Sequence, residues 1–252
     1  MNYHLPEKDP ALKEMAAILE RISSQHGIFD VFFNLMELMA LSISTLWSGE
    51  ERETRLNALE NLLSRLSAEE KTSCFQMAEL LCSVLFKHKD APTDVLGKLF
   101  HAFGLHNKWK GQFFTPDHIC QFMGMVSGPP SEEELKEKGY ISISDPCCGS
   151  GALLIGYLHA LKSRNYDPTN RVLMVAQDID IRCVWMCYIQ LSLYGLPAVV
   201  IHGNSLMQEE QSRWYTPACL TFHPQKEEAE ATSPHGETPT IPTNNDKKEL
   251  IV

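Results

Sequence analysis

Hydrophobic residues recur three and four positions apart between residues 11 and 103, a spacing typical of amphipathic helices. One example is the set Met15, Ile18, Leu19 and Ile22. About four or five helices of ordinary length fit this stretch. Two pairs of residues, Ser48 with Glu51 and Ser67 with Glu70, have the pattern of a capping box, which marks a helix start. The sequence therefore predicts a helical bundle in the first part of the chain.

A stripe of large apolar residues lies within this region, and its members recur at helical spacing: Phe29, Phe32, Phe33, Met36 and Met39. Such a stripe either fills the core of the bundle or lines the site of a bound group. Core packing is the more common reason for this spacing, so we expect these side chains to be buried among the helices.

After Gly111 the pattern changes to short β-rich runs that alternate with helical ones. The runs predicted to be strands are YISIS at 140–144, VLMVA at 172–176 and AVVIH at 198–202. Helical patterns at 152–163 and 181–194 separate them, which predicts right-handed crossovers and a parallel sheet. CLTF at 219–222 is a candidate fourth strand. A complete doubly wound sheet needs several more strands, so a truncated Rossmann-like sheet is expected.

These patterns divide the chain into three parts. We predict a helical N-terminal domain at 1–106, a Rossmann-like α/β domain at 107–224, and a tail at 225–252. The tail is dense in Glu, Thr and Pro and has few apolar residues, so it is expected to be disordered.

The composition of the chain argues against a membrane protein and against a protein that binds DNA through its overall charge. The longest apolar stretch, at 28–47, is interrupted by polar residues, and the N-terminus has no apolar signal region, so we expect a cytoplasmic protein with no membrane insertion. The formal net charge of −10 argues against binding DNA through an overall positive field. Any DNA contact must be local, and Lys98, Lys108 and Lys110 form the best candidate patch, with a solvated loop as the alternative.

The eight cysteines do not have the spacing of a zinc site. Cys147 and Cys148 are adjacent, and Cys183 and Cys187 lie four apart on a predicted helix. A chain of this size without a secretory signal is expected to keep its thiols reduced. We therefore predict neither disulfides nor a metal site.

The strongest chemical signal is DPCCGSG at Asp145–Gly151, where a predicted strand ends and a helix begins. Gly149 and Gly151 allow a sharp turn and let a ligand approach the backbone, and the following helix offers free amides. A tight turn made for structural reasons alone is the alternative.

Two further polar positions follow the next two predicted strands. Asp178 can accept hydrogen bonds from the hydroxyls of a ribose, unless it serves as a helix N-cap, a role for which Asp180 competes. Asn204, after Gly203, can hydrogen-bond a purine edge or form an ordinary turn. All these positions fall at the carboxyl edge of the predicted sheet, where ligands of such folds bind.

Four motifs in this order resemble those of the N-6 adenine DNA methylases, and most closely those of the modification subunits of type I restriction systems. The motifs are GQFFTP at Gly111–Pro116, DPCCGSG at Asp145–Gly151, AQDID at Ala176–Asp180 and HGNSL at His202–Leu206. The resemblance covers about residues 96–206 and implies S-adenosylmethionine as the cofactor.

The resemblance also implies roles for single residues. It assigns Asp178 to the ribose of the cofactor and Asn204, where the family usually has Asp, to the adenine. The residues that it assigns to the methionine end are Phe114, Thr115, Pro116, Asp145, Cys147, Gly149 and Gly151. Thr115 followed by Pro116 also has the pattern of an N-cap and first residue of a helix, which would present further amides to a ligand.

One family feature is absent from the sequence. The family binds the flipped adenine with an Asn/Asp-Pro-Pro-Tyr/Phe motif after a fourth strand, and the nearest remnant here contains His223 and Pro224. Losing the acceptors for the amino group is expected to cost about 3 kcal/mol or more of transition-state stabilisation. Three hypotheses follow. The first is a DNA adenine-N6 methyltransferase that acts on DNA with a specificity or second methyltransferase subunit. The second is an inactive cofactor-binding protein that modulates restriction and modification, and the third, the least favoured, is a helical interaction protein whose α/β part is only a scaffold. A truncated sheet leaves an edge strand exposed, so we also expect either a homodimer or a helix of the N-terminal bundle to cover that edge.

Overall fold

The computed structural model describes residues 10–23, 27–46, 51–105 and 114–224. The described part of the N-terminal region folds into five helices: α1 (Pro10–Ile22), α2 (Ile28–Ser44), α3 (Arg52–Arg65), α4 (Ala68–Lys87) and α5 (Val95–Ala102). The predicted helical bundle is confirmed. Its core is also as predicted, because Phe32 and Met36 are 0% and 1% exposed. The capping box at Ser67 and Glu70 is formed in both directions at the start of α4. The prediction of Glu51 in the first turn of a helix was wrong, because Glu51 is itself the N-cap of α3, and Ser48 lies outside the described residues.

The second part alternates helices and strands. In chain order it contains α6 (Asp117–Ser127), α7 (Glu132–Lys138), β1 (Ile141–Asp145), α8 (Ala152–Ser163), β2 (Val172–Asp178), α9 (Ile181–Leu193), β3 (Ala198–His202), β4 (Ser212–Tyr215) and the 3-10 helix η2 (Pro217–Thr221). None of the described helices has the length and apolar character needed to cross a bilayer.

The four strands form one sheet in the order β1-β2-β3-β4. The first three strands are parallel, as predicted, with Asp145 opposite Ala176 and Asp178 opposite His202. The prediction of a strand at 219–222 was wrong, because this segment belongs to η2, and the fourth strand is β4, which is antiparallel to β3. Pro217 explains the break, since it has no amide hydrogen for the ladder and its fixed φ favours the start of a helical turn.

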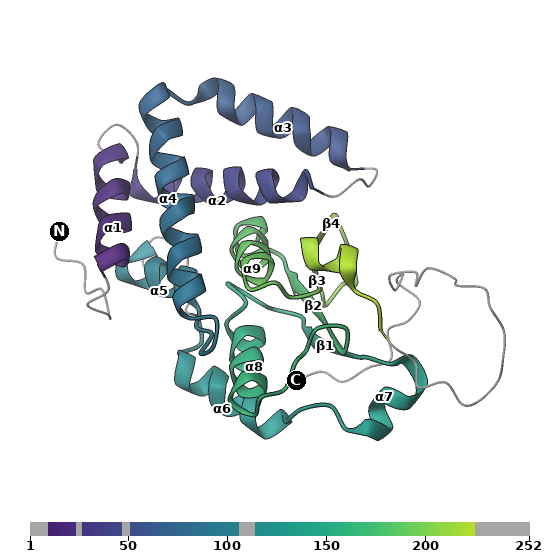
Figure 1. The fold of residues 1–252 in the computed structure, drawn as a ribbon. Coiled ribbons are helices and arrows are strands. Elements are labelled where there is room, and N and C mark those ends of the chain that lie inside the picture. The colour runs from purple at the N-terminus through teal and green to yellow at the C-terminus, as the bar shows by residue number, and fades with distance from the viewer. Residues whose placement is uncertain (1–9, 24–26, 47–50, 106–113, 225–252) are drawn as a thin grey trace.

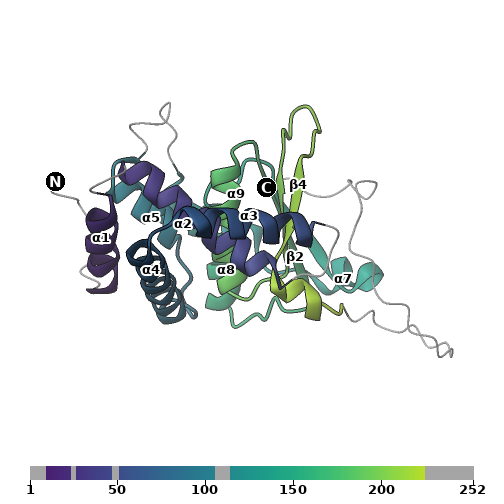
Figure 2. The same ribbon diagram turned by 90° about the horizontal axis from the view of Figure 1, so that it is seen from above.

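The two faces of the sheet are covered differently. Alternate residues of β2, such as Met174, face α8 and α9 in the main core, whereas Leu173 belongs to a smaller cluster with Ile201 and Cys219 of η2. Figures 1 and 2 show α8 and α9 between the helical bundle and the strands. The two crossover helices therefore lie on one face, and their first turns start at the carboxyl edge of the sheet.

The helical bundle and the sheet share one contiguous apolar core that includes residues from α1 to β4. A buried arginine adds a polar link: Arg55 of α3 is 7% exposed, its guanidinium lies 4.1 Å from the centroid of the Trp214 ring, and it donates to Arg213 O in β4. The bundle thus packs directly on the α/β part. The predicted boundary at 106/107 lies outside the described residues and stays a prediction, as does the tail.

Candidate functional site

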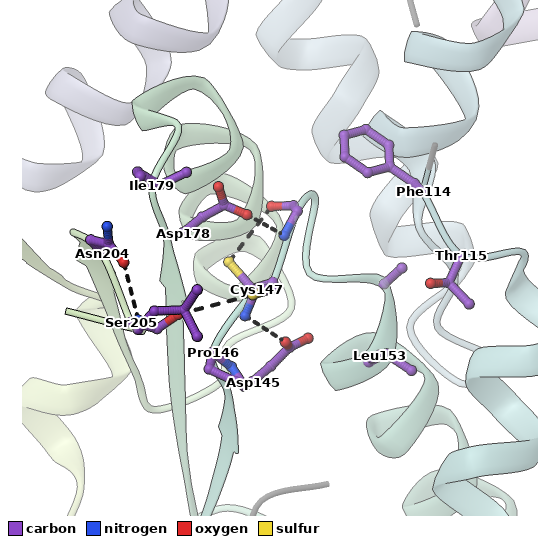
Figure 3. Close-up of a pocket in the computed structure, with 14 residues that line it drawn as sticks. Phe114, Thr115, Asp145, Pro146, Cys147, Leu153, Asp178, Ile179, Asn204 and Ser205 are labelled. Atoms are coloured by element: carbon purple, nitrogen blue, oxygen red, sulfur yellow. Dashed lines mark hydrogen bonds between the residues drawn. The ribbon is translucent and has the colours of Figure 1, made fainter. Parts of the chain in front are cut away.

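The loops after β1, β2 and β3 converge on a cavity of about 430 Å³ at the carboxyl edge of the sheet. Figure 3 shows the 14 residues that line it. They are Phe114, Thr115, Asp145, Pro146, Cys147, Cys148, Gly149, Ala152, Leu153, Asp178, Ile179, Asn204, Ser205 and Leu206. Most of the residues selected from the sequence are therefore brought together around one cavity.

The glycine-rich turn has the backbone that its sequence predicts. Gly149 and Gly151 have φ values of +54° and +91°, a region that residues with a Cβ rarely adopt. Space is limited too, because a Cβ on Gly149 would lie 2.9 Å from the Phe114 ring and one on Gly151 would lie 2.9 Å from Cys187 Sγ. Glycine is thus needed at both positions by conformation and by packing. Gly151 is also the N-cap residue of α8.

Asp178 holds the turn from the cavity side. Its Oδ2 accepts a hydrogen bond from Gly149 N over 2.9 Å, and its Oδ1 accepts one from Asp180 N over 2.9 Å. Burial raises the pKa of Asp178, and these amide hydrogen bonds oppose the rise. The N-cap of α9 is Asp180, which accepts from Arg182 N, so the alternative role for Asp178 as N-cap is excluded.

Asp145 carries an unsatisfied acceptor. Its side chain is 7% exposed and lines the cavity, and its Oδ1 accepts from Cys147 N over 3.1 Å. Its Oδ2 is buried without a hydrogen-bond partner. Burial raises the pKa of Asp145, and the nearby Asp178 raises it further. A buried acceptor without a partner is costly, so this oxygen is suited to a donor supplied by a ligand.

The loop after β3 forms one wall. Asn204 Oδ1 accepts from Leu206 N and Met207 N over 3.1 and 3.2 Å, so the ordinary-turn role that the sequence left open is present. Its Nδ2 donates to no described residue, which leaves a donor at the cavity. Two apolar side chains at the cavity, Ile179 and Leu206, are 65% and 91% exposed. Neither residue was predicted from the sequence, although an isoleucine between two aspartates indicates an apolar side chain in a polar loop, where an exposed apolar residue can mark a binding surface.

Phe114 and Thr115 lie across the cavity from Asn204 and Ser205 (Figure 3). Phe114 N donates to His101 Nε2 over 3.2 Å. The prediction of Thr115 as N-cap was wrong by one residue: α6 begins at Asp117, and its N-cap is Pro116, whose extended backbone (ψ 141°) keeps it outside the helix. Pro116 does not line the cavity, although its neighbour does.

The remaining selected residues lie elsewhere. His223 N donates to Asn170 Oδ1 over 2.8 Å, close to the start of β2, so His223 and Pro224 lie toward the amino edge of the sheet rather than at the cavity. Lys98 forms an ion pair with Asp117 at 2.7 Å and also donates to Thr93. Lys108 and Lys110 lie outside the described residues.

The electrostatics of the cavity favour a ligand with positive charge. Two carboxylates, those of Asp145 and Asp178, line it, and no lysine, arginine or histidine is among its described lining residues. A pyrophosphate would meet like charge here, whereas an ammonium or sulfonium group would meet opposite charge. No group of three or more His, Cys, Asp or Glu side chains in the described ranges is placed to hold a metal ion. All eight cysteines are free thiols.

A glycine-rich turn after β1, a carboxylate after β2 and a polar loop after β3 define a Rossmann-like α/β protein with a cavity at the carboxyl edge of its sheet, the edge at which folds of this class bind their ligands. The model of the family described as N-6 DNA Methylase matches residues 87–232, more than half of the chain. The chain belongs to this family, and the resemblance found in its motifs is confirmed.

Two solved structures show weaker likeness. A protein described as a class I S-adenosylmethionine-dependent methyltransferase from Listeria monocytogenes is 18% identical, with a TM-score of 0.34, and the match covers 78% of this chain and 54% of that chain. The type I restriction-modification methyltransferase subunit from Streptococcus thermophilus is 15% identical, with a TM-score of 0.40, and the match covers 79% and 58%. The chain thus spans a little more than half of each structure. No curated protein matches it.

Proposed function

We propose that the chain binds S-adenosylmethionine in the cavity at the carboxyl edge of its sheet and serves in N6-methylation of adenine in DNA. When bound, this cofactor supplies an electrophilic methyl group on a sulfonium. Membership of the N-6 DNA methylase family supports the reaction class. The cofactor and the DNA substrate are proposals for this chain.

One observation carries the cofactor proposal. Asp145 Oδ2 is buried, has no hydrogen-bond partner and belongs to a carboxylate that lines the cavity. The α-ammonium group of the cofactor supplies both the donor and the positive charge that this oxygen lacks. The described lining residues therefore fit a cationic nucleoside better than a dinucleotide.

The other lining residues have complementary roles in this proposal. Asp178 accepts from the ribose hydroxyls with the lone pairs that its two amide bonds leave unused. Asn204 donates its free Nδ2 hydrogens to the adenine, and the exposed side chains of Ile179 and Leu206 supply apolar contact to the purine faces. Phe114 and Thr115 close the methionine end with Cys147 and Gly149, while Gly151 shapes the turn without lining the cavity.

Calorimetric titration tests binding. We expect the full chain to bind S-adenosylmethionine and its demethylated product S-adenosylhomocysteine, and to bind NAD⁺ at least tenfold more weakly because of the like charges at the cavity. Equal or tighter binding of NAD⁺, or no binding of either sulfur nucleoside at millimolar concentration, would refute the cofactor proposal.

A second function, cofactor binding without methyl transfer by the isolated chain, is favoured by the position of His223 and Pro224. These residues lie toward the amino edge of the sheet, about a strand length from the cavity, and so cannot contact a base that is placed beside the cofactor. Transfer of labelled methyl groups to unmethylated mixed-sequence DNA separates the two functions. Incorporation into adenine by the chain alone excludes the second one.

We also propose that the chain acts together with other protein subunits. A specificity subunit or a second methyltransferase subunit is expected to supply base recognition, and the same transfer assay with such a subunit added tests this. Within the described residues β1 pairs only with β2, and we propose that a second copy of the chain covers its other edge. Sedimentation velocity tests the homodimer. The cytoplasmic location stays a prediction.

A further inference from the structure

We propose that Asp94, at the start of α5, is a positioning residue of the cofactor site that fixes the glycine-rich turn through Ser150. This inference deepens the proposed function and rests on it for its effect on cofactor affinity. The N-terminal helical region supplies neither Asp145 nor Asp178, so this inference gives it a role of its own in the cofactor site.

Asp94 is the centre of a buried hydrogen-bond network. Its side chain is 4% exposed, and Ser150 and Gln190 are both 0% exposed. Ser150 Oγ donates to Asp94 Oδ2. Gln190 Nε2 donates to Asp94 Oδ1 over 2.8 Å and to Ser150 O over 2.9 Å. Gly97 N also donates to Asp94 Oδ1 over 2.8 Å, which caps the first turn of α5. The carboxylate therefore joins the first turn of α5 to two segments that are distant in sequence, those of Ser150 and Gln190.

The turn is thereby held between two buried carboxylates. On the cavity side Gly149 N donates to Asp178 Oδ2, and on the far side the next residue, Ser150, donates to Asp94. Gly149 and Gly151, which flank Ser150, both have positive φ values. Glycine has the fewest steric restrictions on its backbone, so these two residues do little to fix the turn by themselves. Such a backbone has many accessible conformations, so its position depends on these outside contacts.

The segment that carries Asp94 is itself firmly anchored. Tyr194 OH donates to Thr93 O over 2.8 Å and accepts from Thr93 N over 3.1 Å. His159 Nδ1 lies 3.1 Å from Pro92 O. These bonds fix the segment to α9 and α8, so the Asp94 carboxylate is presented to Ser150 from a rigid base.

The other end of α5 reaches the opposite wall of the cavity. His101 Nε2 accepts from Phe114 N, and the rings of Phe100 and Phe114 lie 4.8 Å apart between centroids. Phe114 in turn covers Gly149. One short helix thus contacts the glycine-rich turn through Asp94 and the Phe114 wall through its last residues. Displacing α5 is therefore expected to disturb both walls together.

Three variants of the full chain separate positioning from general stability. Asp94→Ala removes the acceptor. Asp94→Asn keeps Oδ1 as acceptor for Gly97 and Gln190, and its amide can donate to Ser150 Oγ. Thr216→Val is the matched control, because Thr216 is 0% exposed and its hydroxyl bonds Leu196 O and Ala198 N at the amino end of β3, away from the cavity.

Amide hydrogen exchange of the ligand-free chain measures directly how firmly the backbone of the glycine-rich turn is held. Three amides of the turn are hydrogen-bonded: Cys148 N donates to Gln177 O, Gly149 N to Asp178 Oδ2, and Gly151 N to Cys148 O. We expect Asp94→Ala to speed exchange at these amides about tenfold, Asp94→Asn to leave it within about twofold, and Thr216→Val to speed exchange in β3 and β4 only. Calorimetry should show about tenfold weaker S-adenosylmethionine binding for Asp94→Ala and wild-type affinity for Thr216→Val.

The outcomes are distinct. If Asp94→Ala exchanges at the turn as slowly as the wild type, or no faster than Thr216→Val, Asp94 does not position the turn and the inference is wrong. If the wild-type chain binds no S-adenosylmethionine, the proposed function fails, while the exchange data still decide whether Asp94 holds the turn. Should Asp94→Ala not fold, Ser150→Ala removes only the hydroxyl and is judged by the same amides.

Discussion

The backbone amide of Gly149 donates to the carboxylate of Asp178 over 2.9 Å, and this bond joins the loop after β1 to the end of β2. The two residues are 29 positions apart in the sequence. The same carboxylate lines the cavity. Asp178 therefore shapes the cavity and also supplies acceptors to whatever binds there.

Replacing Asp178 with alanine should weaken the free energy of cofactor binding by more than it lowers the free energy of unfolding. The change removes the acceptor of Gly149 N and the proposed acceptor of the ribose, and hydrogen bonds to a charged group contribute about 1.5–3 kcal/mol each. We expect S-adenosylmethionine to bind roughly 10- to 100-fold more weakly in calorimetry. Asp180→Ala, which removes the N-cap of α9, is the control and should cost about 1 kcal/mol of stability with little change in affinity. Equal affinities in the two variants would contradict the assignment.

Asp145 should make the stability of the ligand-free chain depend on pH. Burial raises its pKa above the ordinary value of 3.8, so the folded chain holds this proton more tightly than the unfolded chain. The unfolding free energy then falls as pH rises from about 3.8 through the raised pKa. Asp145→Asn removes this cost, and we expect the variant to be more stable than the wild type at pH 7, with the advantage shrinking as pH falls toward 4.

Urea denaturation between pH 4 and pH 8 measures this difference. Asp167→Asn is a control of opposite sign, because backbone and side-chain hydrogen bonds from Thr169 lower the pKa of Asp167. Its stabilising effect is present at neutral pH and is lost on acidification, so Asp167→Asn should be less stable than the wild type at pH 7. A stability difference for Asp145→Asn that does not change with pH would exclude this account.

Cys147 should report on occupancy of the cavity. Its thiol is exposed and lines the cavity, with Sγ 4.0 Å from Ser205 Oγ. Cys82 on α4 is also exposed and lies outside the cavity, so it serves as an internal reference. At ten times Kd of S-adenosylmethionine we expect iodoacetamide to alkylate Cys147 about tenfold more slowly and Cys82 at an unchanged rate, as measured by peptide mass spectrometry. Protection of both thiols, or of neither, would show that the cofactor does not occupy this cavity.

Gly124 should be essential to the contact between α6 and α8. A Cβ at this position would lie 2.6 Å from Gly156 O and 2.7 Å from Tyr157 Cα, so Gly124→Ala forces the two helices apart. Overpacking of this kind costs about 1–3 kcal/mol, and a shift of α6 also moves Thr115 just before it. We expect a lower unfolding free energy and weaker cofactor binding. Gly27→Ala, whose Cβ would meet only Asp30 Oδ2 at 3.5 Å, should leave cofactor binding unchanged.

The elements that the sequence predicts well are those that local pattern specifies. The strands β1 to β3 were found because each is a short β-rich run followed by a polar turn, and β3 has the predicted limits of 198 and 202. The edge strand β4 was missed because its four residues lack a buried alternation of their own. It is held by the ladder to β3 and by Arg55 against Trp214, contacts that come from elsewhere in the chain.

Some residues of the candidate site could also be predicted from local sequence patterns, and others could not. Glycines at a strand-to-helix turn and an acid after the next strand are local signals. The structure places Gly149 and Asp178 at one cavity, whereas Gly151 lies behind it as the N-cap of α8. His223 follows the segment first expected to be a strand, and its position near Asn170 depends on η2 instead. Nothing local connects Asp94 with Ser150, because these residues are 56 positions apart.

The sequence by itself determined the helical bundle, the parallel strands and the glycine-rich turn, because hydrophobic period and backbone conformation act over a few residues. Only the tertiary structure decided which carboxylates hold that turn, which acceptor is left without a partner at Asp145, and which way the last strand runs. These features depend on which distant segments meet when the shared core forms, and no short stretch of sequence encodes that meeting.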